Sequence, residues 1–227
     1  MSAVASRRMQ AVVLRRTNYG EADRIVKLLT SEGQISVMAR GVRREKSKLA
    51  GGIELFAVSD ITVHQAKGDL EVLTSARLEK FYRHILEDYD RLQFGYEAIN
   101  AVAKASDQLN EPGWFDVLVE VYKGLDESLV QLKLVQTWFY VQYAALTGYE
   151  LNLDRDVADA KLLASKKYMY DASEKGLRLS EQGDISADHI KFLRLVAAKP
   201  LLTVAQIGGI DAILADCWLL ARQHAAV

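Results

Sequence analysis

The hydrophobic period of the chain changes near residue 81, and this change constrains its fold more than any other feature. Before it, polar and apolar residues alternate with a period of two, as from Gln34 to Arg40, which is typical of half-buried β-strands. After it, apolar residues recur with a helical period, as from Leu92 to Ala103. We therefore predict an α+β chain with two domains, residues 1–80 and residues 81–227.

The first 80 residues contain five strand-like runs, at residues 11–14, 24–30, 34–40, 61–64 and 71–74. Turn signals separate them, among them Ser31-Glu32-Gly33 and Lys67-Gly68-Asp69. Five short strands within about 70 residues predict a small closed or nearly closed β-barrel, of which the OB-fold is the commonest of this size.

The rest of the chain predicts an all-α helical domain with one small insertion. We expect helices over about 81–108, 114–123, 127–146, 186–198 and 204–224. The third is apolar on nearly every side, so it is expected at the buried centre of the bundle. Residues 167–170 and 177–179 predict a β-hairpin insertion around 165–180.

Positive charge is concentrated at the N-terminal end. Residues 1–50 hold 11 Lys and Arg against 4 Asp and Glu, whereas the remaining 177 residues hold 18 against 26. Such asymmetry indicates a polyanionic partner for the basic end, and the densest part is the loop at residues 40–48. A solvated surface loop is the alternative.

A small β-barrel with a basic loop suits tracking of a phosphodiester backbone without reading its sequence. Tyr19 is a possible stacking platform, whereas Phe56 is expected in the core. The candidate nucleic-acid-binding residues share positive charge and lie on the predicted strands or in the loop: Arg15, Arg16, Arg24, Lys27, Arg40, Arg43, Arg44, Lys46 and Lys48. Because adjacent strand residues face opposite sides, Arg15 and Arg16 cannot share one groove.

The sequence contains no phosphate-cradling glycine loop, no nucleophile elbow and no spaced histidine pair. The single cysteine, Cys217, lies in an apolar helical run and predicts a buried thiol, without a disulfide or a cysteine-cluster metal site. Asp154, Asp156 and Asp159 are typical of an exposed acidic loop more than of a Mg²⁺ site. We expect no enzymatic activity, no cofactor and no metal.

Nothing in the sequence predicts a membrane partner. No apolar segment follows Arg7-Arg8, and no stretch of 18 uncharged apolar residues occurs. We therefore expect a cytoplasmic protein.

Two segments closely resemble the opening of the RecO family of bacterial recombination mediators and DNA repair proteins. They are residues 11–30, with Tyr19-Gly20-Glu21-Ala22-Asp23-Arg24, and residues 33–56, with Gly41-Val42-Arg43-Arg44. Beyond residue 80 the resemblance is sparse, at Leu146-Thr147-Gly148-Tyr149, Leu153-Asp154 and Lys199-Pro200-Leu201.

The resemblance implies an N-terminal OB-fold followed by a helical domain. It implies a non-catalytic protein that binds single- and double-stranded DNA, anneals complementary strands and assists recombinase loading. The implied partners are a RecR-like mediator protein and the acidic C-terminal tail of the single-strand-binding protein. Candidate cations for the tail are Lys133, Lys191, Arg194 and Lys199.

Three departures from the family pattern matter. Asp156 and Asp159 stand where many members have the first cysteine pair of a zinc module, so zinc is expected to be absent. Gln136-Thr137-Trp138 stands where members often have arginine for the tail, and the basic C-terminal extension is missing. Two other readings stay open at this point, an OB-fold RNA-binding protein and a protein–protein adaptor that uses its helical domain.

Overall fold

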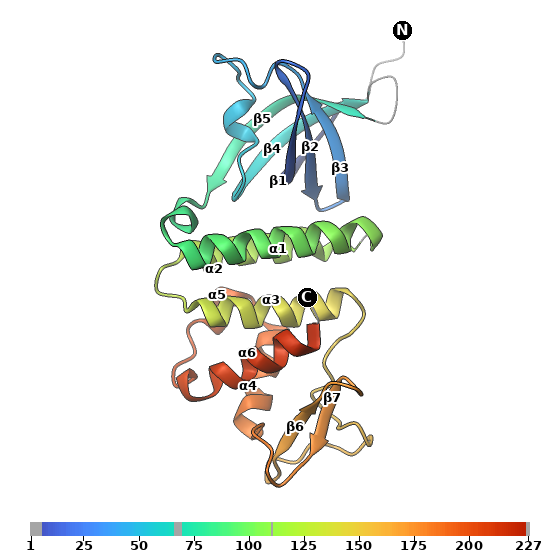
Figure 1. The fold of residues 1–227 in the computed structure, drawn as a ribbon, viewed down its shortest axis with the longest axis vertical. Helices are drawn as coiled ribbons and strands as arrows, with labels where there is room; N and C mark the ends of the chain where they lie inside the picture. Colours follow the sequence, from blue (N-terminus) through green and yellow to red (C-terminus); the bar gives the residue numbers. More distant parts are fainter. Residues whose placement is uncertain (1–5, 66–69, 110, 226–227) are drawn as a thin grey trace. The chain divides into compact units, whose positions relative to one another are not determined.

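The computed structural model describes residues 6–65, 70–109 and 111–225, and it divides into two compact units, Met1–Tyr122 and Lys123–Val227. The first unit holds a five-stranded sheet and α1 (Tyr89–Gln108) (Figure 1), and α2 (Gly113–Asp126) spans the boundary in the chain between Tyr122 and Lys123. A sheet followed by helices confirms the α+β fold class. The proposed domain limit after residue 80 stays a prediction, because the two units are defined by compactness alone.

The five strands are β1 (Ser6–Tyr19), β2 (Asp23–Thr30), β3 (Gly33–Ala39), β4 (Ala57–Gln65) and β5 (Glu71–Phe81). Their order is β1-β2-β3-β5-β4, and β4 also pairs with β1, so the sheet closes on itself. All pairs are antiparallel except β3 with β5. This OB-fold-like arrangement confirms the predicted runs, while the predicted turn at Lys67-Gly68-Asp69 lies outside the described residues.

The interior of the closed sheet is filled by alternate apolar residues, among them Val13, Val26, Val37, Ile61 and Leu73. Alternation sends one residue of each pair inward, so the predicted period of two is the direct cause of this core. β1 and β5 are longer than predicted, because polar residues at their ends still pair through the backbone.

A short 3-10 turn, Ala50–Gly52, packs closely against β5. A Cβ atom placed on Gly52 would lie 2.3 Å from the Ala76 carbonyl oxygen, whereas one placed on Gly51 would meet nothing within 4 Å. Since a backbone carbonyl in a paired strand cannot easily move, only glycine fits at residue 52.

Replacing Gly52 by alanine is therefore expected to lower the free energy of unfolding by about 1–3 kcal/mol, because the added methyl group overpacks the contact with β5. Urea unfolding of the Gly52→Ala and Gly51→Ala variants measures this. Gly51→Ala is the matched control and is expected to change the free energy of unfolding by less than about 0.5 kcal/mol. Equal losses in both variants would contradict the close approach.

Helix α1 lies along one end of the sheet (Figure 1). Asp88 caps its start by accepting a hydrogen bond from the Arg91 amide. The Gln34 amide nitrogen donates to the Ala103 carbonyl at 2.7 Å and contacts the Ser106 hydroxyl at 2.6 Å. Gln34 lies near the start of β3, so the chain leaves the opposite end of β3, away from this contact with α1, to form the basic loop.

Phe56 is a packing centre of the first unit and confirms its predicted place in the core. Its ring meets Tyr96 and Tyr122 edge-on, with centroids 5.2 and 5.6 Å apart. Its backbone adopts φ of 55°, a left-handed conformation that is costly for a bulky residue. The carbonyl of Phe56 accepts a hydrogen bond from Tyr82, which helps to hold this conformation.

The second unit contains α3 (Leu132–Leu146), α4 (Ala187–Ala198), α5 (Leu201–Val204), α6 (Asp211–Ala225) and the hairpin of β6 (Tyr168–Asp171) and β7 (Gly176–Leu179). Helix α3 packs against α4 and α6 and buries residues on most of its sides, which confirms its predicted central place. The predicted hairpin is also confirmed. Among the described helices, none is long and apolar enough to cross a bilayer.

Three helix predictions were wrong in their limits. The first helix, α1, begins at Tyr89 and not near residue 81, because the chain up to Phe81 pairs in β5 and Arg83–Glu87 form a 3-10 helix. The last helix, expected over 204–224, begins only at Asp211 as α6, because Gly208-Gly209 precede it and glycine disfavours a helix interior by about 1 kcal/mol per residue. The short helix α5, which ends at Val204, was not predicted. The third helix begins at Leu132, five residues later than expected, after a turn in which Val130 donates to the Glu127 carbonyl.

Cys217 is buried in α6, which confirms the predicted buried thiol. Burial, together with the nearby Asp216 carboxylate, raises the pKa of the thiol to about 12. We expect native protein at pH 8 to react with a disulfide reagent many times more slowly than urea-unfolded protein, because the thiolate is the reacting species. Fast, stoichiometric labelling of the native protein would contradict this placement.

Candidate nucleic-acid interface

The basic loop of residues 40–48 is anchored to the turn that joins β1 and β2. Gly41, at φ of 62°, donates its amide to the Asp23 carboxylate at 2.6 Å. Arg43 donates its amide to the Ala22 carbonyl at 2.9 Å and its guanidinium to the Gly20 carbonyl at 3.2 Å. The start of the loop is therefore fixed, and the side chains that follow Arg43 project from a defined base.

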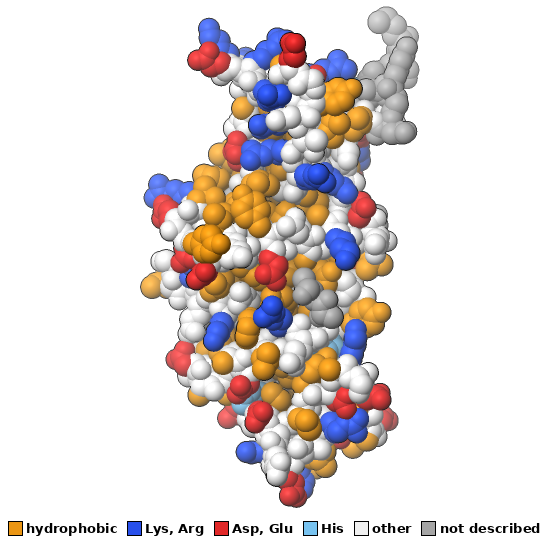
Figure 2. All heavy atoms as spheres, viewed as in Figure 1, with side chains coloured by type: hydrophobic (Ala, Val, Ile, Leu, Met, Phe, Trp, Pro, Cys, Tyr) orange, Lys and Arg blue, Asp and Glu red, His pale blue; other side chains and the backbone are white. Residues whose placement is uncertain are grey.

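The loop carries five exposed cations, Arg40, Arg43, Arg44, Lys46 and Lys48. Among the described residues, no carboxylate lies within ion-pair distance of any of them. Arg7 and Arg8, on β1, differ in this respect, because Arg7 contacts Glu32 and Glu71 and Arg8 contacts Asp60. The charge of the loop is thus not neutralised within the described protein. Figure 2 shows Lys and Arg side chains gathered at the end of the sheet from which the basic loop projects.

A bulge in β1 decides which of its arginines faces outward. The pairing with β2 shifts between Val13 and Arg15, so that Arg15 stands opposite Lys27 and Arg16 stands opposite the buried Val26. Arg15 is exposed, whereas Arg16 donates to the Glu54 carboxylate at 2.8 Å and to the Ile53 carbonyl at 3.3 Å. The two neighbouring arginines therefore lie on opposite faces.

Two of the nine candidate cations already have a carboxylate partner. Arg16 pairs with Glu54, and Lys27 pairs with Asp107 of α1 at 2.7 Å. Arg24, at the end of β2 nearest the loop, donates to the Asn18 side-chain oxygen at 3.1 Å and keeps its charge unpaired among the described residues. The structure thus separates seven cations without a carboxylate partner from two with one.

Tyr19 ends β1 beside the turn that anchors the loop, and it is 55% exposed. An exposed aromatic ring next to unpaired cations has the composition of a site that stacks a base while contacting its phosphate. Tyr19 stands opposite Asp23, the residue that holds Gly41, so ring and loop belong to the same end of the sheet.

Two exposed arginines, Arg8 and Arg77, were not among the candidates predicted from the sequence. Both contact the Asp60 carboxylate, at 2.6 and 3.0 Å, across the β1, β4 and β5 face. The hydrogen bond from Arg8, followed by that from Arg77, holds the pKa of the Asp60 carboxyl below its usual value. Only the strand pairing brings these residues together, so the sequence carried no signal for them.

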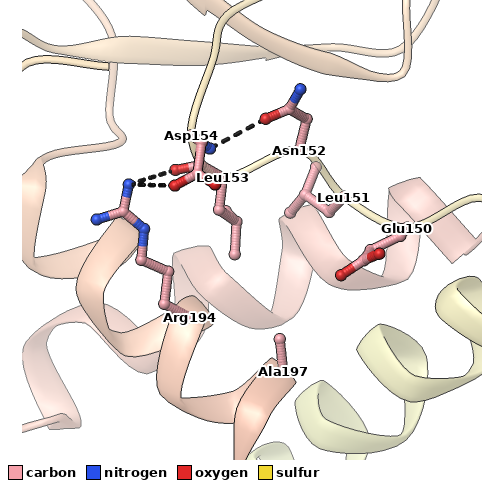
Figure 3. Close-up of a pocket in the computed structure, with 7 residues that line it drawn as sticks. All are labelled: Glu150, Leu151, Asn152, Leu153, Asp154, Arg194 and Ala197. Carbon is pink, nitrogen blue, oxygen red and sulfur yellow. Dashed lines mark hydrogen bonds and ion pairs between the residues drawn. The ribbon is translucent and has the colours of Figure 1, made fainter. Parts of the chain in front are cut away.

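The four cations considered for a partner tail all lie in the second unit. Lys191 contacts Asp188 at 3.1 Å, and Arg194 contacts the Leu153 carbonyl at 2.7 Å and Asp154 at 3.1 Å (Figure 3). Lys191 and Arg194 share one hollow of about 110 Å³, which Leu163 also lines. Lys133 lies on α3 and Lys199 caps the end of α4.

A larger cavity of about 530 Å³ lies between the segment 150–154 and α4 (Figure 3). Its floor is apolar, from Leu151, Leu153 and Ala197, and Glu150 and Asp154 stand at its rim with Arg194. Because the two carboxylates outnumber the one cation, this cavity disfavours an acidic ligand. No group of three or more His, Cys, Asp or Glu residues suited to a metal occurs in the described part of the chain.

Residues 1–82 match the family profile described as "Recombination protein O N terminal". The "DNA repair protein RecO" of Dehalococcoides mccartyi is 29% identical over 198 residues, which cover 82% of this chain and 76% of that protein. The chain is thus similar to RecO proteins over most of its length, and its N-terminal segment matches the profile for the N-terminal part of recombination protein O. The RecO proteins of Rubrobacter xylanophilus and Roseiflexus are 28% and 32% identical over 148 and 120 residues, and the matches cover 59% and 42% of those proteins. The segment that matches the RecO profile, residues 1–82, contains the whole basic loop.

Proposed function

We propose that this chain acts in DNA repair and recombination by binding DNA through its N-terminal unit, without catalytic turnover and without a cofactor. One observation carries the proposal: five exposed cations project from an anchored loop and have no carboxylate partner among the described residues. The similarity to proteins named DNA repair protein RecO supports DNA as the polyanion.

In this proposal the loop follows the phosphodiester backbone. Arg15 and Arg24 extend the contact along β1 and β2, and Tyr19 stacks on a base. Arg16 and Lys27 can also contact phosphate, once each has released its ion pair with Glu54 or Asp107. Phosphate contacts carry no base sequence, so binding should be tolerant of sequence and steeply dependent on salt.

The same contacts give the chain a physical route to strand annealing. Two complementary strands repel each other through their phosphates, and a protein that neutralises part of that charge lowers the barrier to their encounter. We propose that the chain binds single- and double-stranded DNA and anneals complementary strands. We also propose that it assists recombinase loading together with a RecR-like mediator protein.

We further propose that the acidic tail of the single-strand-binding protein contacts the hollow at Lys191 and Arg194. A tail that ends in an aromatic residue needs an apolar slot beside a cation. Leu163 and Ile190 provide the slot, and Lys191 and Arg194 provide the charge. Lys199 is a second candidate near the end of the same helix. The pairing of these cations with Asp188 and Asp154 predicts weak, salt-sensitive binding.

A competition experiment tests the proposed function. The full chain, bound to a fluorescent mixed-sequence single strand, is challenged with unlabelled DNA, RNA of the same sequence and an acidic peptide, at about 50 and 200 mM salt. We expect DNA to compete best and the peptide least, together with acceleration of annealing. Preferential competition by RNA or by the peptide would instead support an RNA-binding protein or an adaptor.

A further inference from the structure

Trp218, on α6, carries two cations over its indole ring. The Lys133 ammonium, from α3, lies 5.7 Å from the ring centroid, and the Arg222 guanidinium, one turn further along α6, lies 5.4 Å from it. Cation–π contacts of this kind hold two long side chains close to one rigid surface. The three residues form what we call the Trp218 cluster.

The Trp218 cluster lacks an anion. Within the described residues, neither Lys133 nor Arg222 lies within ion-pair distance of a carboxylate. The indole N–H of Trp218 is buried and has no hydrogen-bond acceptor there. Lys133 and Arg222 are both exposed, so each can contact an anion from solvent, whereas the buried indole N–H cannot.

The acidic residues of α6 are engaged elsewhere. Asp211 accepts a hydrogen bond from the Gln131 side chain at 2.7 Å, and Asp216 lies 3.4 Å from the His189 ring. The cluster therefore keeps its positive charge in a unit whose 12 Lys and Arg are outnumbered by 13 Asp and Glu.

We propose that Lys133 and Arg222 of the Trp218 cluster each contact a phosphate of the DNA backbone, as a DNA-binding surface in the second unit that is separate from the basic loop. This inference rests on the proposed function. Neighbouring phosphates of one strand offer acceptor oxygens to each of the two cations. An acidic peptide ending in an aromatic residue fits less well, because the indole that would receive its ring is already covered by two cations.

A second phosphate contact would also serve annealing. A protein that brings two DNA strands together must bind both of them. The basic loop alone provides a binding surface for only one strand. The loop and the Trp218 cluster lie in different units, so each can contact its own strand.

Tryptophan fluorescence reads this cluster selectively. Trp114 and Trp138 are 1% and 5% exposed, and each donates its indole N–H to a backbone carbonyl, whereas Trp218 is only half-buried. Iodide, an anionic quencher, should therefore quench mainly Trp218, and caesium should do so much less. A mixed-sequence single strand should protect Trp218 from iodide, and the Trp218→Phe variant should lose both the quenching and the protection.

Binding measurements with the full-length variant Lys133→Ala/Arg222→Ala complete the test. Loss of two phosphate contacts should reduce the salt slope by about 1.4, since each contact to a single strand contributes about 0.7. The variant Arg155→Ala/Arg178→Ala is the matched control, because it removes two cations of the same unit that already contact Asp159 and Asp171. Its slope should change by less than half as much.

The outcomes separate the two proposals. Wild-type DNA binding by Lys133→Ala/Arg222→Ala, with weakened binding by a loop variant, would overturn the second contact and leave the proposed function standing. Normal binding by both variants would overturn the proposed function itself. Protection of Trp218 by an acidic peptide or by inorganic phosphate, but not by DNA, would also overturn the second contact.

Discussion

Replacing Arg44 and Lys46 together by alanine is expected to weaken binding of single-stranded DNA roughly 25-fold near 0.1 M salt. The estimate assumes that each side chain contributes one phosphate contact, with a salt slope of about 0.7 per contact. Neither side chain has a carboxylate partner among the described residues, so the loss should be purely that of the DNA contact. Arg43 is left in place because it also anchors the loop to Gly20. Fluorescence anisotropy at several salt concentrations measures both affinity and slope.

The matched control for this variant is Arg8→Ala with Arg77→Ala. It removes the same formal charge from the same unit, but from arginines that already share the Asp60 carboxylate. The control should lose much less affinity, and far-ultraviolet circular dichroism should show both variants folded. An equal or larger loss in the control would mean that total charge, and not the loop, governs binding.

Replacing Phe56 by alanine is expected to lower the free energy of unfolding by about 3–5 kcal/mol. The ring is 1% exposed and is packed by Tyr96 and Tyr122, so its removal leaves a cavity at the junction of the sheet and the helices of the first unit. Alanine at φ of 55° is also a non-glycine residue in the left-handed region, so the backbone strain is not relieved and the loss reports packing.

Urea unfolding followed by circular dichroism measures the effect of Phe56→Ala. Tyr89→Ala serves as the control, because Tyr89 is 75% exposed and its loss should cost less than about 0.5 kcal/mol. A loss below about 1 kcal/mol for Phe56→Ala would contradict its role as a packing centre. Phe56→Leu should fall between the two, since it retains part of the buried volume.

The positions of the strands could be predicted because alternation along one strand reflects burial on one face. The closed order of the strands could not, since the pairing of β1 with β4 joins residues such as Ala11 and Ser59 that lie far apart in the sequence. The late start of the last helix was signalled by Gly208-Gly209, but the apolar pattern on either side favoured one continuous helix.

The sequence predicted which Lys and Arg residues belong to the candidate site, but not which of them have a carboxylate partner. Whether a cation is paired depends on partners that only the fold brings near, such as Glu54 for Arg16 and Asp107 for Lys27, 38 and 80 residues away. The same limit hid the Trp218 cluster, because Lys133 and Trp218 meet only across the packed helices α3 and α6.

Hydrogen–deuterium exchange of the full chain, with and without a mixed-sequence single strand, tests most directly whether the anchored loop is the DNA-binding surface. We expect amides of residues 40–48 and of the β1–β2 turn to exchange more slowly when DNA is bound, and this protection to disappear in about 1 M salt. Protection elsewhere in the chain, with residues 40–48 exchanging as in the free protein, would contradict the assignment of DNA binding to the loop.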